Sequence, residues 1–253
     1  MMSIEQTEKY FHTTPKGNVT ILGSRSDICH ELAKRFDADD WQVTGWKRDE
    51  KLPLVPWDLL ICGIGVLDPI GKFFETDADE WEQNIDSNVL LPLRLLRRLW
   101  KHRKPNASVC FFSGAGVSRF AQTYSGYAAS KLMLFKMTEL LDDEEPDTKF
   151  FILGPGMVRT KIQRQTVLAG PRAANIERVM QFMDKGDPQH GTGTSHDKIY
   201  KCVRWCMNQP KNVIGGRNVY IPSDRWDETD FLPQSLAEHN ALFKLRRLGD
   251  GKF

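Results

Sequence analysis

Tyr127 and Lys131 are the side chains of this sequence whose types and spacing best suit proton transfer. They open the stretch 127–141, which is rich in residues with high helix propensity. Residues four apart share one face of a helix, and an ammonium beside a phenol lowers the tyrosine pKa from about 10. Tyr127 would then act as an acid or base near neutral pH. The alternative is an exposed helical pair without catalytic meaning.

Three glycine-containing turns follow strand-like runs and are typical of a nucleotide site. Gly23 follows the run 18–22 and leads into a helical stretch, whose first N–H groups would point at a phosphate. The run 58–65 ends in Gly63-Ile64-Gly65, and Pro155-Gly156 follows the run 149–154. Backbone at the carboxyl end of such strands faces the ligand crevice of an α/β sheet. Each turn alone is equally compatible with an ordinary strand-to-loop connection.

The elements that must position these residues alternate along the chain. Strand-like runs lie at 18–22, 41–45, 58–65, 108–113, 149–154 and 218–221, and helical stretches separate most of them. After Asp58, the run 58–65 is continuously apolar, as in strands covered on both faces. The pattern predicts the α/β class, with a single Rossmann-like doubly wound parallel sheet flanked by helices on both faces.

The length of 253 residues suits one domain, 1–253, with a core at 17–222. Residues 157–195 mix Gly, Pro, Thr and His, and predict a flexible loop beside the substrate. The tail 223–253 begins irregularly, and Ser235 with Glu238 then predicts the capped start of a helix.

Composition and charge exclude several classes of function. With 35 basic and 33 acidic residues the formal net charge is +2, which gives no reason to invoke nucleic acid or a membrane surface. No apolar run approaches the roughly 20 residues of a membrane span, and no signal-peptide pattern opens the chain. Five scattered cysteines suit a reducing compartment, so we expect a cytoplasmic protein. The spacing of His190, His196, Cys202 and Cys206 matches no zinc pattern, so no metal site is expected.

Taken in order, these motifs resemble the short-chain dehydrogenase/reductase family over about residues 17–222. Gly23 matches the first glycine of that family's cofactor turn, with Asp27 and Cys29 where the second and third glycines usually fall. Cys62-Gly63-Ile64-Gly65 matches its Asn-Asn-Ala-Gly strand end, and Pro155-Gly156 its Pro-Gly motif. The resemblance implies a catalytic tetrad of Asn88, Ser113, Tyr127 and Lys131.

The resemblance also implies the role of each residue. Tyr127 gives or takes the substrate proton, and Lys131 lowers the Tyr127 pKa and hydrogen-bonds the nicotinamide ribose. Ser113 hydrogen-bonds the substrate oxygen, although Gly114 holds the commonest family spacing, and Asn88 holds a water in a proton relay. The implied cofactor-binding residues are Gly23, Ser24, Arg25, Ser26, Asp27, Ile28, Trp46, Lys47, Arg48, Cys62, Gly63, Ile64, Tyr127, Lys131, Pro155, Gly156, Val158 and Thr160.

The chain departs from the family pattern in two places besides the serine. Cys29 replaces the glycine that allows close packing of helix on strand. Between the second and fourth family strands, where the family fits a helix, a strand and another helix, this chain has only residues 46–57. The sheet is therefore expected to be shortened there, with 52–55 as a remnant of the missing strand.

The residues at the end of the second strand favour NADP over NAD. An acidic side chain there would bind the ribose hydroxyls of NAD, but Gly45 holds this place. Trp46-Lys47-Arg48 and Arg25 would bring cations to the 2′-phosphate of NADP. The alternative is a solvated basic loop, because Asp49 and Glu50 follow directly.

Three functions stay open at this point. The first is an NAD(P)-dependent oxidoreductase that transfers a hydride between a nicotinamide cofactor and a secondary alcohol or ketone. The second is a sugar-modifying isomerase or lyase with tightly held cofactor, suggested by a tail like those of family members linked to surface-carbohydrate synthesis. The third is a non-catalytic dinucleotide-binding sensor or scaffold, suggested by the missing glycines. A small-molecule substrate and a homodimer or homotetramer, built through helices at 80–103 and 127–142, follow from the resemblance.

Overall fold

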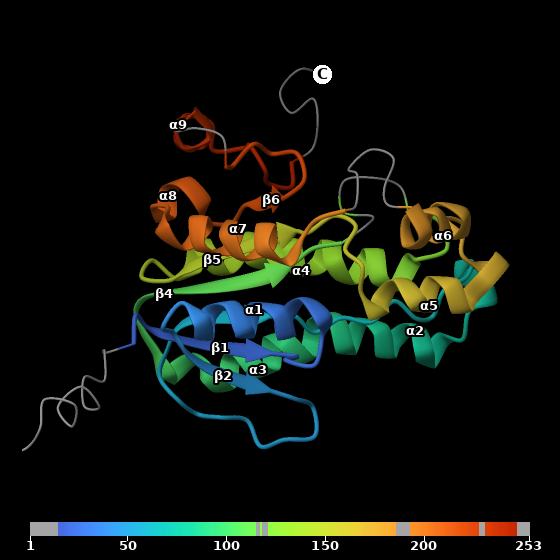
Figure 1. The fold of residues 1–253 in the computed structure, drawn as a ribbon, viewed down its shortest axis with the longest axis horizontal. Helices are drawn as coiled ribbons and strands as arrows, with labels where there is room; N and C mark the ends of the chain where they lie inside the picture. Colours follow the sequence, from blue (N-terminus) through green and yellow to red (C-terminus); the bar gives the residue numbers. More distant parts are fainter. Residues whose placement is uncertain (1–14, 115–116, 118–120, 186–192, 228–230, 247–253) are drawn as a thin grey trace, which may run out of the picture.

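A six-stranded parallel sheet forms the centre of the computed structural model, which describes residues 15–114, 117, 121–185, 193–227 and 231–246. The strands run in the order β2-β1-β3-β4-β5-β6, all parallel (Figure 1). They are β1 (Asn18–Leu22), β2 (Gln42–Trp46), β3 (Trp57–Cys62), β4 (Arg103–Phe112), β5 (Lys149–Gly154) and β6 (Asn218–Tyr220). The predicted doubly wound sheet, shortened beside its second strand, is confirmed.

Helices cover both faces of the sheet (Figure 1). α1 (Asp27–Ala38) and α7 (His196–Asn208) pack on one face, and α3 (Leu91–Leu99) and α4 (Ser125–Glu144) pack on the other. The remaining helices are α2 (Ala78–Ile85), α5 (Lys161–Ala169), α6 (Ile176–Lys185), α8 (Lys211–Ile214) and α9 (Phe231–Glu238), with 3-10 turns η3 (Phe73–Glu75), η5 (Trp100–His102) and η6 (Gly170–Arg172). No helix among the described residues is long and apolar enough to cross a membrane.

The continuous apolar run of β3 is explained by burial on both sides of the sheet. Leu59 and Ile61 pack with α1 and α7, whereas Leu60 and Cys62 pack with α3 and α4. Successive side chains of a strand point to opposite faces, so a strand covered twice needs apolar residues at every position.

The long helical stretch after β3 is interrupted by a π-helical turn, η4 (Asp86–Leu90), between α2 and α3. Pro92 lies in the first turn of α3, where its missing N–H costs nothing. The interruption thus precedes the proline, and Ser87, Asn88 and Val89 within it are buried. Such π turns insert a residue into the helical ladder and often occur at functional sites.

Three local expectations were wrong. Residues 52–55 form no strand. Among the described residues, β2 therefore has no strand partner on the side away from β1. The described part of the region 157–195, which leaves out 186–192, contains α5 and α6 instead of a flexible loop, because Ile162, Ala169 and Ile176 pack in an apolar cluster with Tyr127. In the tail, α9 begins before Ser235, which lies inside the helix and does not cap it.

Candidate active site

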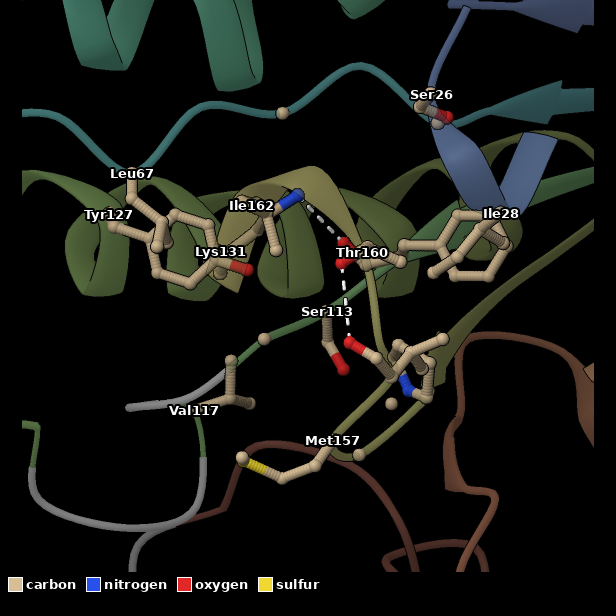
Figure 2. Close-up of a pocket in the computed structure, with 18 of the residues that line it drawn as sticks. Ser26, Ile28, Leu67, Ser113, Val117, Tyr127, Lys131, Met157, Thr160 and Ile162 are labelled. Atoms are coloured by element: carbon tan, nitrogen blue, oxygen red, sulfur yellow. Dashed lines mark hydrogen bonds between the residues drawn. The ribbon is translucent and has the colours of Figure 1, made fainter. Parts of the chain in front are cut away.

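One cavity of about 1240 Å³ lies at the carboxyl ends of the strands. Its lining includes the residues that follow four strands: Gly23 after β1, Gly63 after β3, Ser113 after β4 and Pro155 after β5. Figure 2 shows Ser26 and Ile28 at one end of the cavity, and Tyr127 with Leu67 at the other. The strands therefore gather most of the predicted cofactor and catalytic residues around one space, as a parallel sheet does at its carboxyl edge, whereas Ser24, Cys62 and Asn88 are not part of its lining.

The opening turn between β1 and α1 contains a single glycine, Gly23, in a left-handed conformation. Gly23 has φ +80°, which residues with a side chain rarely adopt. The amides of Gly23 and Ser24 donate to the Trp46 carbonyl at 3.0 and 3.1 Å, which ties the turn to the end of β2. Ser26 caps α1 by accepting from the Cys29 amide at 3.3 Å.

The missing third glycine is compensated across the interface between helix and strand. Cys29 is fully buried, and a Cβ built on Gly63 would lie 2.0 Å from the Cys29 sulfur. The volume of Cys29 is thus accommodated by a glycine at the end of β3, where the family pattern has an asparagine. α1 can approach the strand closely in spite of the cysteine.

Tyr127 is buried against the backbone at the end of β4. Only 8% of the residue is exposed, and a Cβ on Gly114 would lie 2.1 Å from the Tyr127 hydroxyl. Burial raises the pKa of Tyr127 to about 12. The expectation that Lys131 lowers this pKa is not met in this geometry, in which desolvation dominates.

Lys131 lies one helical turn beyond Tyr127 and faces the same cavity. Its ammonium donates to the Phe112 carbonyl at 3.0 Å and lies 5.6 Å from the centre of the Tyr127 ring. Burial lowers the pKa of Lys131 to about 8, because the charged form loses its hydration. The lysine is therefore oriented by the end of β4.

Asn88 in the π turn is held by three hydrogen bonds. Its Oδ1 accepts from the Val66 amide at 2.8 Å, and its Nδ2 donates to the Val66 carbonyl and to Asn84 Oδ1. Asn88 Oδ1 and the Lys131 ammonium each lie 3.7 Å from where a Cβ on Gly65 would stand. Asn88 and Lys131 thus both lie next to Gly65, on the side where a side chain at this position would project.

Asn84 is a site residue that sequence reasoning missed. It is buried and donates to the carbonyls of Val66, Leu67 and Asp68, so it shapes the loop that follows β3. Its spacing four residues before Asn88 places both amides on one helical face, and this spacing was the signal available in the sequence.

Ser113 does not face Tyr127. Its hydroxyl donates to Asn218 Oδ1 at 3.0 Å and lies 3.1 Å from where a Cβ on Gly154 would stand. The position that faces the Tyr127 hydroxyl is Gly114, which has no side chain to offer. The role inferred for Ser113, a hydrogen bond to the substrate oxygen, is therefore not supported by this geometry.

The Pro-Gly turn after β5 carries the chain from the sheet to α5. Gly156 has φ +69°, and a Cβ there would lie 2.5 Å from Pro222, so only glycine fits. Thr160 precedes α5, and its hydroxyl donates to the Val158 carbonyl at 3.3 Å. The first amide of α5, that of Lys161, donates to Asp27 in the opening turn at 2.5 Å.

The cations expected at the adenosine end differ in their partners. Arg25 lies 3.5 Å from Asp49, with both side chains exposed, and the half-buried Lys47 lies 3.0 Å from Glu50. Arg48 is also exposed, but it donates to Ser87 Oγ of the π turn at 3.3 Å and has no carboxylate partner among the described residues. All three cations line the cavity, and the ion pairs of Arg25 and Lys47 match the solvated-loop alternative.

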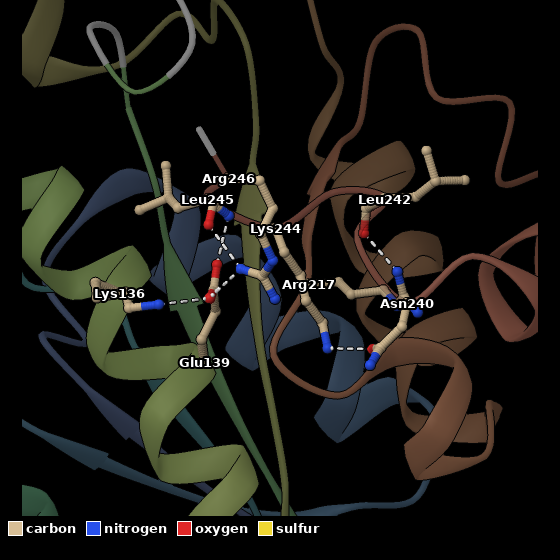
Figure 3. A network of polar contacts seen from close by, with 8 residues as sticks. All are labelled: Lys136, Glu139, Arg217, Asn240, Leu242, Lys244, Leu245 and Arg246. Carbon is tan, nitrogen blue, oxygen red and sulfur yellow. Dashed lines mark hydrogen bonds and ion pairs between the residues drawn. The ribbon is translucent and has the colours of Figure 1, made fainter. Parts of the chain in front are cut away.

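The C-terminal segment forms a further wall of the cavity, to which residues 243–246 contribute. Figure 3 shows how Glu139 of α4 holds this segment: it accepts from the Leu245 amide at 2.5 Å, from Arg246 at 2.8 Å and from Lys136 at 2.9 Å. Arg217 is buried and donates to the carbonyls of Leu236, His239 and Leu242.

The residues around the cavity fit a nicotinamide dinucleotide. Asp27 and Ile28 open α1, and the first amides of a helix have no acceptor within it and suit a phosphate. The volume exceeds the roughly 300–1,000 Å³ of an ordinary small-molecule site, so a dinucleotide and a substrate can share it. No group of three His, Cys, Asp or Glu side chains among the described residues could hold a metal ion, and His190 lies outside those residues.

Comparisons with known sequences point in the same direction. The model of the family described as Enoyl-(Acyl carrier protein) reductase matches residues 39–221. An uncharacterized oxidoreductase of Saccharomyces cerevisiae is 29% identical over 129 residues, 49% of this chain and 50% of that protein. One of Schizosaccharomyces pombe is 29% identical over 107 residues, 42% and 43% of the two chains. The matched region is thus about half the length of either relative or less.

Solved structures share the fold at low sequence identity. Levodione reductase superposes with a TM-score of 0.68 at 14% identity, over 85% of this chain and 100% of that chain. A small-chain dehydrogenase in complex with NADPH gives 0.67 at 17% identity, over 81% and 96%. A short chain dehydrogenase/reductase of Saccharomyces cerevisiae gives 0.65 at 17% identity, over 83% and 97%.

Proposed function

The chain belongs to the short-chain dehydrogenase/reductase family, and we propose that it transfers a hydride between NADP(H) and a secondary alcohol or ketone. The observation that carries the proposal is the meeting of Tyr127, Lys131 and Asn88 at the carboxyl edge of the sheet, beside a helix N-terminus suited to a dinucleotide. The nicotinamide would supply the hydride, and the side chains of this chain would handle the proton.

Tyr127 is the proposed proton carrier. With its pKa raised to about 12 by burial, the phenol holds its proton at neutral pH. It is then ready to donate to a carbonyl oxygen as that oxygen gains negative charge, which is the step that ketone reduction requires. Oxidation of an alcohol, the reverse reaction, needs a phenolate as base, and a cation close to the phenol would favour it. The Lys131 ammonium would provide this cation if it moved from the Phe112 carbonyl toward Tyr127.

Lys131 and Asn88 support this transfer in different ways. Lys131 has a pKa lowered to about 8 and so exchanges its proton close to physiological pH, as a relay member should. Asn88 is fixed by Val66 and Asn84 and is proposed to orient that relay. Ser113 is proposed to act through Asn218, at the side of the cavity, and not on the reacting oxygen.

Arg48 supports the preference for NADP over NAD. It lines the cavity beyond β2, no acidic side chain follows β2 directly, and Ser87 orients the guanidinium from the π turn. A guanidinium suits a phosphate because it offers paired donors in one plane. Two solved structures of similar fold were determined with NADPH and with NADP.

The remaining features concern the whole chain. We propose a single catalytic domain over 1–253. A homodimer or homotetramer formed through α4 and the stretch of η4 and α3 is supported by the exposure of Leu90 in η4 and of Met133 and Leu140 in α4, at 40%, 42% and 42%. A cytoplasmic location is supported by five cysteines that are all buried and unpaired, since free thiols persist in a reducing compartment.

The first experiment is a fluorescence titration of the purified protein with NADPH and NADH, beside the double variant Lys47→Ala, Arg48→Ala. Micromolar NADPH binding that the double variant loses would support the NADP proposal, and a screen of secondary alcohols and ketones would follow. Turnover that Tyr127→Phe abolishes would support the oxidoreductase. Cofactor binding without turnover of any substrate would favour the sensor, and cofactor retained through purification would favour the isomerase or lyase.

A further inference from the structure

Asp27 connects the two helices that open on the cofactor end of the cavity. Its Oδ2 accepts from the Lys161 amide at 2.5 Å, and its Oδ1 lies 3.3 Å from the Lys161 ammonium. Asp27 is the first residue of α1 and Lys161 is the first residue of α5. A single carboxylate thus stands between two helix N-termini that belong to distant parts of the chain.

Both helix ends favour a negative charge. Thr160 makes no side-chain cap for α5. The Asp27 carboxylate instead accepts from the Lys161 amide, which has no acceptor within the helix. The N-termini of α1 and α5 add positive partial charge, and the Lys161 ammonium adds a full one. These are the partners that a dinucleotide diphosphate would use at this edge of the sheet.

We propose that Asp27 sets the cofactor affinity of this protein as an internal anion that competes with the cofactor diphosphate for the α5 N-terminus and Lys161. The proposal rests on the proposed function, since it presumes that a dinucleotide binds here. A diphosphate reaching α1 has to draw Lys161 away from Asp27 and tolerate the carboxylate beside it. Glycine, which the family pattern has at this position, would impose neither cost.

A purely structural role for Asp27 predicts the opposite sign. If the carboxylate only clamps α5 in place and neutralises the helix ends, its removal loosens the cavity and weakens cofactor binding. If it competes, its removal tightens binding, because two like charges a few ångströms apart repel even near the protein surface. Asparagine separates the two roles, since it keeps an acceptor for the Lys161 amide without the charge.

The experiment measures the dissociation constant of NADPH by fluorescence for the full chain and for Asp27→Asn and Asp27→Gly. Asp37→Asn is the control, because Asp37 is an exposed carboxylate on α1 that does not line the cavity. Both Asp27 variants are expected to bind NADPH about tenfold more tightly, the change that roughly 1.4 kcal/mol of lost repulsion produces. The control is expected to match the wild type.

A double-mutant cycle with Lys161→Met adds a second test. Removing the ammonium should cost more affinity in the Asp27→Asn background than in the wild type, because there the diphosphate no longer shares Lys161 with a carboxylate. Equal costs in the two backgrounds would count against the competition.

Wild-type binding of NADPH with equal or weaker binding by Asp27→Asn overturns the inference and leaves the proposed function standing. If no variant binds a dinucleotide, the proposed function fails, and a thermal-shift assay with inorganic pyrophosphate decides about Asp27. Stronger stabilisation of Asp27→Asn than of the wild type by pyrophosphate supports the competing anion, and equal stabilisation overturns it.

Discussion

The sulfur of Cys29 occupies the space in front of Gly63, so that a Cβ on Gly63 would lie 2.0 Å from it. The first residue comes from α1 and the second from the end of β3. In the family pattern the glycine is on the helix and the larger residue is on the strand. Here the larger residue, Cys29, is on the helix and the glycine, Gly63, follows the strand, so α1 still packs closely on the sheet.

Gly63→Ala should destabilise the fold by about 1–3 kcal/mol, the usual cost of forcing one extra group into a packed core. Cys29→Ala should recover most of this loss in the double variant, because it removes the sulfur that the new methyl group meets. Urea denaturation measures both. Gly65→Ala is the matched control, since its Cβ would meet nothing nearer than 3.7 Å. Additive losses in the double variant would contradict this exchange of positions between the larger residue and the glycine.

Tyr127→Phe and Ser113→Ala should separate the proton carrier from its neighbour. Loss of the phenol should lower kcat by about 100-fold or more, as expected for a general acid. Ser113→Ala should lower kcat by no more than about threefold, against the roughly 100-fold that loss of a donor to the reacting oxygen costs. Steady-state kinetics on an identified substrate measures both, and a large effect of Ser113→Ala on kcat would show that its hydroxyl leaves Asn218 for the substrate.

Asp224 should make stability depend on pH between about 4 and 6. Burial raises the pKa of its carboxyl from 3.8 to about 6, although the Tyr220 amide donates to it. The folded protein holds this proton more tightly than the unfolded chain, so the stabilisation is complete below about pH 4 and is lost as pH rises through 6. The slope should stay below about 1.4 kcal/mol per pH unit, since one proton is involved.

Asp224→Asn should flatten this dependence and make the protein more stable than the wild type above pH 6. Urea midpoints from pH 4 to pH 8 measure the difference. Asp227→Asn, at an exposed position three residues on, should leave the wild-type dependence intact. An Asp224→Asn curve parallel to that of the wild type would rule out Asp224 as the titrating group.

Arg217→Met should destabilise the protein by roughly 1–3 kcal/mol. The guanidinium donates to three carbonyls of the C-terminal segment, and that of Leu236 is a buried acceptor that the substitution would leave without its donor. Figure 3 shows Arg217 beside Leu242, one of the three. Arg94→Met is the control, because the ion pair of Arg94 with Asp86 is exposed, and such a pair is typically worth less than about 1 kcal/mol. Thermal denaturation compares the two, and equal losses would contradict the role assigned to Arg217.

The order of strands and helices along the chain could be predicted because the residues of a strand reflect which of its faces are buried. β3 is apolar from Leu59 to Cys62 since both of its faces are covered there, and Tyr127 and Lys131 lie four apart on one helix. The two helices of 157–195 were missed, although Ile162, Thr166 and Ala169 recur at helical spacing. The mixture of Gly, Pro, Thr and His in this region suggested a loop instead.

The orientation of Ser113 and the pKa of Tyr127 could not be predicted from spacing. Neighbouring residues at the end of a strand point to opposite sides, so a shift of one position exchanges Ser113 for Gly114. Because Gly114 has no side chain, the Tyr127 ring packs directly against the backbone there. The resulting desolvation raises the pKa of Tyr127 in spite of the neighbouring Lys131. Both outcomes depend on packing between β4 and α4, which no local pattern records.

The shortened sheet leaves β2 as an outer strand. Among the described residues β2 pairs with β1 alone, so the donors and acceptors along its other side meet no neighbouring strand. Such an open ladder can template pairing with another chain. Here it is only five residues long and includes Gly45, which weakens a strand, and short edges are one way in which sheets limit aggregation. The edge that the shortened sheet leaves open is thus itself short, which limits the number of hydrogen bonds it can offer to another chain.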